Sequence, residues 1–476
     1  MNPDPTTTTD SYRQPGAIVR FDALAACDGT GLVIQNASAL VQFNGNGPFV
    51  KLLALDIWHE IDSHPAAKHA KRIRLHNSVV IPGMVNAHTH LDLTHIGPQP
   101  HDSTQGHGAF VRWIDMIRAA RHSDPTEIAN SVRQGIALSL AAGVVAVGDI
   151  AGAPKGFPTL TPYETLAASH LQGVSFLEFF AIGTGRSRGR ERIESILADL
   201  RSPNPNVKFG LQPHAPNTVD AREYRWAAEL AERTGLPLST HLAETPEEHQ
   251  FIAEAKGPQR ELLERLGVWD NSILEQIGHG RTPTRHLQEA LSVARFAAAH
   301  VNDADDIALT ILAQTQTSVI YCPRASEYFG AATHFGPHRY QEMINAGINV
   351  ALGTDSIVNL PSSNSDRAIE VGSSPVPSKS VPPTSMPTTP TDQSLPLLST
   401  LDEARLLHTR DNTNPLQLLR MLTLNGAAAL QLNPTAFQFL PNQQLAGLVA
   451  IQVDSLQPPE HPFTACLRSP HPLRLL

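Results

Sequence analysis

The sequence predicts an α/β fold in which a (β/α)8 TIM-type barrel is joined to a small β-sandwich domain built from the N-terminal and C-terminal segments. Three observations predict it. Short apolar runs alternate with helical patterns from residue 79 onward, most of these runs end in His or Asp, and the flanking segments carry short apolar runs separated by Gly, Asn and Asp. The length of 476 residues suits a barrel of about 250 to 400 residues with one satellite domain.

Composition divides the chain into segments. Residues 1–15 are polar with a run of Thr and predict a disordered tail. The small β domain is expected over residues 16–78 and 440–476, and the barrel over residues 79–439. Within the barrel region, residues 361–399 are rich in Ser, Pro and Thr and nearly free of aromatic residues, so they predict a flexible low-complexity insertion.

Eight apolar runs predict the barrel strands, since short runs separated by helical patterns are typical of βα units on a parallel sheet. The runs are VVIPGMVNAH (79–88), VVAVGD (144–149), SFLEFFAIG (175–183), VKFGLQPH (207–214), PLSTH (237–241), ARFAAAH (294–300), SVIYC (318–322) and NVALGTD (349–355). Helices are expected at 127–142, 191–200, 219–234, 303–312 and 339–346, and after the insertion at 401–408 and 415–430.

Composition also restricts the class of protein. Hydrophobic residues make up 41% and charged residues 17%, a globular mixture, and the formal charge of -9 disfavours binding to nucleic acid or to an anionic membrane. We expect a small-molecule substrate instead. Three scattered cysteines, the absence of a signal-peptide pattern and the absence of a long apolar run predict a cytoplasmic protein. The oligomeric state stays open, a homodimer included.

The ends of three predicted strands carry candidate metal ligands. His88 and His90 are two residues apart on an extended segment, so their side chains point to the same side. His241 ends the fifth run and Asp355 the eighth, and strand ends meet at one face of a barrel. Each piece has a plainer interpretation: a chance pair among 22 histidines, a surface loop around His241 and Glu244, or a helix cap at Asp355. Together, three imidazoles and one carboxylate form a ligand set suited to zinc.

Six motifs in this order resemble the amidohydrolase superfamily, in its branch of cytosine/adenosine-deaminase-like and chlorohydrolase-like enzymes. They are PGMVNAHTHLDLTHIG, LQPHAPNTV, STHLAET, AAHVND, YCPRASEYFG and ALGTDS, and the resemblance covers about residues 79–360. Within the branch, HTHLDLTHIG, YCPRASEYFG and the HFGPH that follows are most similar to aminodeoxyfutalosine deaminases.

The resemblance implies a role for each matching position. One divalent ion, zinc or alternatively iron, would be bound by four ligands: His88, His90, His241 and Asp355. Glu244 would be the proton shuttle and His300 would orient the attacking water, with Asp355 as the third catalytic residue. Three further positions would contact the substrate: Asp92, His214 and Arg324. Other polar candidates are expected to be structural, Asp149 as a hydrogen-bonding residue and Cys322 as a buried packing residue.

These roles imply hydrolytic deamination of an aminated purine or purine nucleoside-like compound, aminodeoxyfutalosine among the candidates. A divalent ion lowers the pKa of bound water from 15.7 to about 7, which supplies hydroxide for attack on the amidine carbon, and ammonia leaves. The alternative enzyme acts on another heteroaromatic ring, by dechlorination or by deamination of guanine or a thioether nucleoside, because one such site supports all of these reactions. A non-catalytic metal-binding barrel is the alternative outside enzymes, and a missing ligand or shuttle would favour it.

Overall fold

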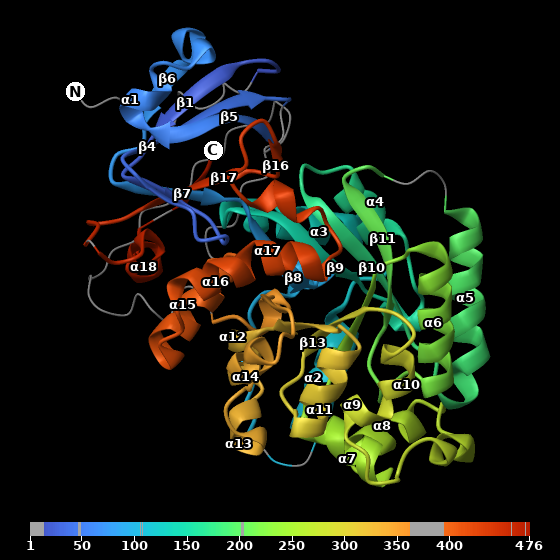
Figure 1. The fold of residues 1–476 in the computed structure, drawn as a ribbon. Helices are drawn as coiled ribbons and strands as arrows, with labels where there is room; N and C mark the ends of the chain where they lie inside the picture. Colours follow the sequence, from blue (N-terminus) through green and yellow to red (C-terminus); the bar gives the residue numbers. More distant parts are fainter. Residues whose placement is uncertain are drawn as a thin grey trace, which may run out of the picture.

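The centre of the structure, a computed structural model, is a barrel of parallel strands. Its sheet contains eight strands in chain order, and an isolated parallel bridge between Thr89 and Asp355 joins the first strand to the last. The predicted (β/α)8 class is confirmed (Figure 1). The strands are β8 (Met84–Thr89), β9 (Val144–Ala151), β10 (Gln172–Phe179), β11 (Val207–Pro213), β12 (Leu238–Leu242), β13 (Phe296–His300), β14 (Ser318–Tyr321) and β15 (Val350–Leu352).

Helices cover the outside of the barrel, and several begin at a residue whose side chain accepts backbone N–H groups. Asp124 accepts from Thr126 and Glu127 at the start of α3, and Asp305 accepts from Ala308 at the start of α11. The helices are α2 (Ala109–Ala120), α3 (Pro125–Ala141), α4 (Thr161–Ala167), α5 (Arg186–Asp199), α6 (Ala221–Thr234), α7 (Pro246–Glu254), α8 (Pro258–Arg265), α9 (Pro283–His286), α10 (Gln288–Leu291), α11 (Asp306–Gln314), α12 (Pro323–Tyr328), α13 (Ala331–Phe335) and α14 (Tyr340–Asn345). Short 3-10 helices lie at Pro65–His69, Leu91–Ile96, Pro154–Gly156, Gly183–Gly185, Asn271–Glu275, Ile357–Asn359 and Pro434–Phe437.

The small domain consists of two five-stranded sheets, each with strands from both ends of the chain (Figure 1, blue and red). Their orders are β16-β5-β4-β1-β6 and β18-β17-β7-β2-β3. Buried apolar residues of both sheets, such as Phe21 and Val41 from one and Val80 and Leu448 from the other, form a shared core, as expected for a sandwich. The strands are β1 (Ile18–Asp22), β2 (Ala25–Cys27), β3 (Val33–Gln35), β4 (Ala37–Phe43), β5 (Val50–Ile57), β6 (Lys71–Arg74), β7 (Ser78–Pro82), β16 (Gln444–Leu445), β17 (Leu448–Gln452) and β18 (Leu473–Leu475), with helices α1 (Trp58–Ile61) and α18 (Pro462–Arg468).

The first predicted barrel strand is wrong as a single element. Residues 79–82 belong to β7, which pairs with β17 and β2 in the small domain, and the barrel strand β8 begins only at Met84. Gly83 separates the two strands, and a Cβ at this position would lie 2.5 Å from Cγ2 of Val145. The close approach of the neighbouring strand therefore requires a residue without a side chain, and there the chain passes from one sheet to the other.

The helix predicted at 415–430 is also wrong as a single element. It is divided into α16 (Pro415–Leu422) and α17 (Leu424–Ala429) at Thr423, whose φ of -126° and ψ of -88° are not helical. Together with α15 (Thr400–Asp411), these helices pack against β15 and against one another. They lie between the small domain and the barrel in Figure 1, where α15 and α16 are drawn in red and orange.

The structure describes residues 14–45, 49–104, 106, 108–200, 204–361, 395–457, 459–471 and 473–476. The predicted disordered tail and most of the predicted insertion lie outside the described residues, so both stay predictions. In the described part of the chain, no helix combines the length and the apolar composition needed to cross a membrane.

Candidate active site

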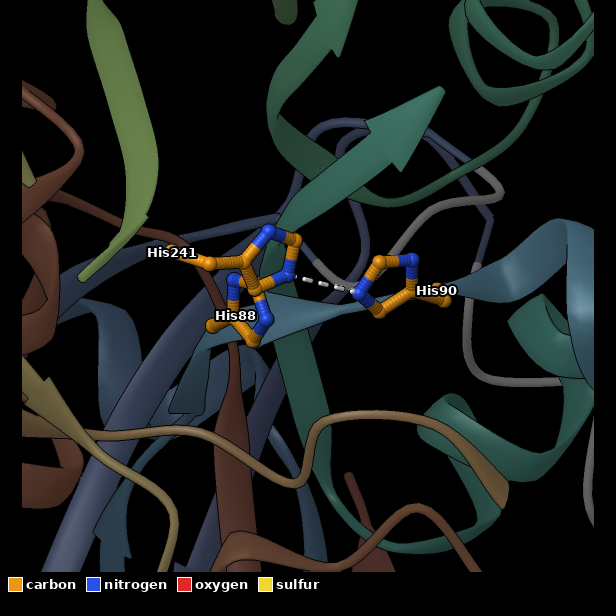
Figure 2. A group of neighbouring side chains, drawn as sticks. All are labelled: His88, His90 and His241. Atoms are coloured by element: carbon orange, nitrogen blue, oxygen red, sulfur yellow. Dashed lines mark hydrogen bonds between the residues drawn. The ribbon is translucent and has the colours of Figure 1, made fainter. Parts of the chain in front are cut away.

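Three histidines meet at one end of the barrel. His88 is in β8, His90 directly follows this strand, and His241 is in β12. Their ligand atoms all lie within 4.8 Å of one another, and the Nε2 atoms of His90 and His241 are 3.2 Å apart (Figure 2). The structure thus brings together residues that are about 150 positions apart in the sequence.

Asp355 and His300 complete this cluster. Asp355 follows β15, and its Oδ1 lies 3.7 Å from His88 Nε2 and 3.4 Å from His90 Nε2. His300 is the last residue of β13, and its ligand atom lies within 4.8 Å of those of His88 and Asp355. The predicted ligands and His300 therefore surround one point.

Hydrogen bonds and backbone conformation fix this arrangement. The N–H groups of Thr354 and Asp355 both donate to the carbonyl of His88 at 3.1 Å, which ties the last strand end to the first. Asp355 and His300 have φ angles of 55° and 72°, in the left-handed region that residues with a side chain seldom adopt. Such conformations are typical of functional sites, where the surrounding structure imposes them.

The donor atoms fit a divalent cation. Among the described residues, both ring nitrogens of His88 and of His300, and Nδ1 of His90, are buried without a hydrogen-bond partner, which is costly for a polar group. Burial lowers the pKa of His88 to about 3, so the imidazole is neutral and has a lone pair to donate. Ligands in a tetrahedral zinc site are about 3.3 Å apart, close to the 3.2 to 3.7 Å measured between these atoms.

Glu244 lies beside the cluster in the loop after β12. Its Oε1 is 3.6 Å from Nε2 of His300, and its side chain is 12% exposed. Its backbone is fixed on both sides, because its N–H donates to Glu248 Oε2 at 2.8 Å and its carbonyl accepts from Asn302 Nδ2 at 3.0 Å. Burial, reinforced by the negative charge of Asp355, raises the pKa of Glu244 well above its usual value, which favours the protonated carboxyl group.

The predicted substrate-contacting residues fall into two groups. The ring of His214 lies 5.0 Å from that of His241, next to the histidine cluster. Asp92 accepts from Arg121 Nε at 2.9 Å, and Arg324 Nε donates to the buried Glu403 at 2.6 Å. The charges of Asp92 and Arg324 are therefore paired within the protein, and substrate contact stays a prediction for all three residues.

Two charged residues of the site were missed from the sequence. Arg121, which directly follows α2, lies between Asp92 and Glu178, and Glu178 Oε1 is 3.9 Å from Nε2 of His214. Glu178 is a single acid within the apolar run SFLEFFAIG, and this is a usable signal, because an ionisable side chain in a fully buried strand needs a partner or a function. Asp149 accepts the N–H of Leu91 at 3.0 Å, and Cys322 is buried, as predicted for both.

A cavity of about 420 Å³ has Thr245 and Pro246, the two residues that follow Glu244, in its wall. Aromatic rings form part of the wall, with the ring centres of Phe110 and Phe329 5.2 Å apart. Its described lining residues include Glu247 and Glu254 but no Lys or Arg.

Comparisons with known proteins agree with this fold. The chain is 30% identical over 302 residues to an aminodeoxyfutalosine deaminase of Deinococcus radiodurans, an alignment that covers 59% of this chain and 65% of that protein. It is 23% identical over 428 residues to a 5-methylthioadenosine/S-adenosylhomocysteine deaminase of Thermococcus sibiricus, covering 81% and 79%. The crystal structure of Helicobacter pylori aminofutalosine deaminase with methylthio-coformycin has the same fold, with a TM-score of 0.68, 21% identity and coverage of 96% and 98%.

A family model decides the wider assignment. The model of the amidohydrolase family matches residues 79–436, which is the barrel with its C-terminal helices and the whole histidine cluster. The chain spans somewhat less than two thirds of the length of the Deinococcus relative, so this relative alone does not decide the family. On the match over most of its length, the chain belongs to the amidohydrolase family.

Proposed function

We propose that the chain is a metal-dependent hydrolytic deaminase that acts on an aminated purine nucleoside or a nucleoside-like compound. The observation that carries the proposal is the position of the Glu244 carboxyl group, 3.6 Å from His300 and beside three histidines and Asp355. A proton donor next to a metal-binding cluster is what hydrolysis of a cyclic amidine requires. Relatives named as deaminases of nucleosides support the same class of substrate.

In this proposal His88, His90, His241 and Asp355 hold one divalent ion. Three imidazoles and a carboxylate favour zinc, with iron as the alternative. When bound, the ion lowers the pKa of a coordinated water to about 7 and supplies the nucleophile at neutral pH.

The protein groups move the protons. Glu244, whose protonated form is favoured by burial, donates to the ring nitrogen of the substrate, which makes the adjacent carbon electrophilic. His300 orients the attacking water and Asp355 accepts its proton. Water adds to the carbon, and Glu244 passes the proton of the added hydroxyl to the amino group. The carbon–nitrogen bond then breaks to release ammonia and a ring carbonyl, and the proton held by Asp355 restores Glu244.

The test combines metal analysis with ammonia release. Purified protein should contain about one zinc or iron per chain and release ammonia from at least one of adenosine, 5-methylthioadenosine, S-adenosylhomocysteine and aminodeoxyfutalosine, with guanine as the free-base comparison. His241→Ala should lose both the metal and the activity, whereas His279→Ala, at an exposed position, should keep both. Full metal occupancy in His241→Ala would remove His241 from the ligand set, and no ammonia from any nucleoside would refute the function.

A further inference from the structure

Glu178 is a buried acid next to the metal-binding cluster that the proposed mechanism does not use. It is on β10, its side chain is 2% exposed, and the neighbouring strand β11 leads directly to His214. The ligand atoms of Glu178, His214 and His241 lie within 4.8 Å of one another. Glu178 therefore lies beside the metal-binding cluster, near the ends of the third and fourth barrel strands.

The two carboxylate oxygens of Glu178 have different surroundings. Oε2 accepts the N–H of Ala153 at 3.1 Å and lies 3.5 Å from Nη1 of Arg121. For Oε1, the structure shows no hydrogen bond among the described residues, and its separation of 3.9 Å from His214 Nε2 is too long for one. One oxygen is thus fixed by the protein, and the other is left to accept from a ligand.

Nε2 of His214, which faces Glu178 Oε1, is also an acceptor. Thr218 Oγ1 donates to the carbonyl of Ala215 at 3.1 Å, and His214 Nδ1 lies 2.7 Å from the same hydroxyl oxygen. With the hydroxyl proton directed to Ala215, Nδ1 carries the ring proton and donates to Thr218. Nε2 then carries only a lone pair, and it points toward the carboxylate of Glu178.

The proposed function, on which this inference rests, limits which groups can lie between Glu178 Oε1 and His214 Nε2. The ring nitrogens of an adenine nucleoside that are not bonded to the sugar are all acceptors, so apart from the departing amino group its donors are the sugar hydroxyls. We propose that Glu178 Oε1 and His214 Nε2 bind the hydroxyl groups of the substrate's sugar and so select a nucleoside over a free base.

The charge of the cluster agrees with a hydroxyl ligand. The single positive charge of Arg121 is shared between two acids, Asp92 and Glu178, so this cation is already paired within the protein. The nearby cation is thus not free to bind an anionic group of the substrate, which favours a neutral donor as the ligand of Glu178 Oε1. Glu178 is accordingly a specificity-determining residue, because its effect depends on which donor the substrate presents.

Glu178→Gln tests the idea because the protein dictates how the amide must lie. Ala153 N–H and Arg121 both donate at the Oε2 position, so the amide oxygen has to occupy it. The NH2 group then replaces Oε1 and meets the substrate hydroxyl with a donor. Loss of a hydrogen bond to a charged group should weaken binding of the ribosyl compound about 10- to 100-fold.

The experiment measures binding of inosine and 2′,3′-dideoxyinosine, the deaminated products, to metal-loaded protein by calorimetry. Wild type should bind inosine at least about 10-fold more tightly, and Glu178→Gln should lose this preference while its affinity for the dideoxy compound changes less than about threefold. Glu223→Gln is the matched control. Glu223 is another buried acid, on the outer helix α6, and it is paired with Arg190 at 3.0 Å. Its replacement should leave both affinities unchanged.

Each contrary result identifies what failed. Equal loss of both ligands in Glu178→Gln, or a wild type that does not distinguish them, would overturn the inference while ammonia release from adenosine still supports the deaminase. Absence of both binding and ammonia release would overturn inference and function together. A second metal ion per chain that disappears in Glu178→Gln would make this group a metal site instead. If Glu178→Gln does not fold, the comparison of the two ligands on wild type still decides the case.

Discussion

Replacing Glu244 by Gln should abolish turnover and leave the metal and the fold in place. The backbone of Glu244 is held by Glu248 and Asn302 through its N–H and carbonyl groups, so its side chain is not needed to position the loop. The amide has almost the same shape, and no ligand atom of the histidine cluster is removed. What is lost is the exchangeable proton.

The size of the loss follows from what the carboxyl group does. A positioned general acid/base contributes about 10² to 10⁴ in rate, and Glu244 is asked to transfer a proton twice in each cycle. We therefore expect kcat to fall by about 10⁴, equivalent to about 5.5 kcal/mol in the barrier, and KM to change less than about threefold. Ammonia release gives the rate, elemental analysis the metal content, and thermal unfolding the state of the fold.

Two results would refute this reasoning. If the metal content falls together with the activity, as it should in His241→Ala, then Glu244 is a ligand and its assigned role is wrong. If both metal and turnover persist, another group transfers the proton, and His214 and His300 are the next residues to replace.

Three further predictions concern the protein around the site. Gly83→Ala should destabilise by about 1 to 3 kcal/mol in urea unfolding, because its Cβ would lie 2.5 Å from Val145, and adding Val145→Ala should restore much of the loss. Arg121→Ala should cost about 3 to 5 kcal/mol, since it leaves Asp92 and Glu178 buried without their cation; a loss below about 1 kcal/mol would show that the pair is not needed. His338, whose burial lowers its pKa to about 4, takes up protons more readily when unfolded, so its contribution is complete above pH 6.5 and decreases as the pH falls toward 4. From pH 7 to pH 5, wild type should lose about 2 kcal/mol relative to His338→Gln, and parallel pH curves would contradict this.

The sequence was sufficient for the barrel and for the residues that meet at its mouth. His88, His241, His300 and Asp355 follow or end apolar runs, and parallel strand ends converge on one face whatever the details of packing. The position of each side chain in the cluster thus depends mainly on the order of strands. Loop residues were less predictable, because Arg324 pairs with Glu403 across 79 positions and no local pattern indicates this.

The elements that the sequence did not predict depend on contacts between distant segments. The apolar run 79–88 has no polar break, and only the pairing of its first half with β17 and the closeness of Val145 to Gly83 divide it. Thr423 interrupts a helical pattern with a residue that helices tolerate. Glu178 stands out as the single acid in an apolar run, but its partner Arg121, 57 positions away, is known only from the structure.

The division of one continuous run between two sheets constrains when the enzyme can be completed during synthesis. β7 lies between β2 and β17, so its second neighbour is present only after residues 448–452 have been synthesised. Domains generally fold as units once their chain is available, and here the unit includes both ends of the chain. The small domain, whose sheets contain β16, β17 and β18, is therefore completed only after the barrel strands have been synthesised.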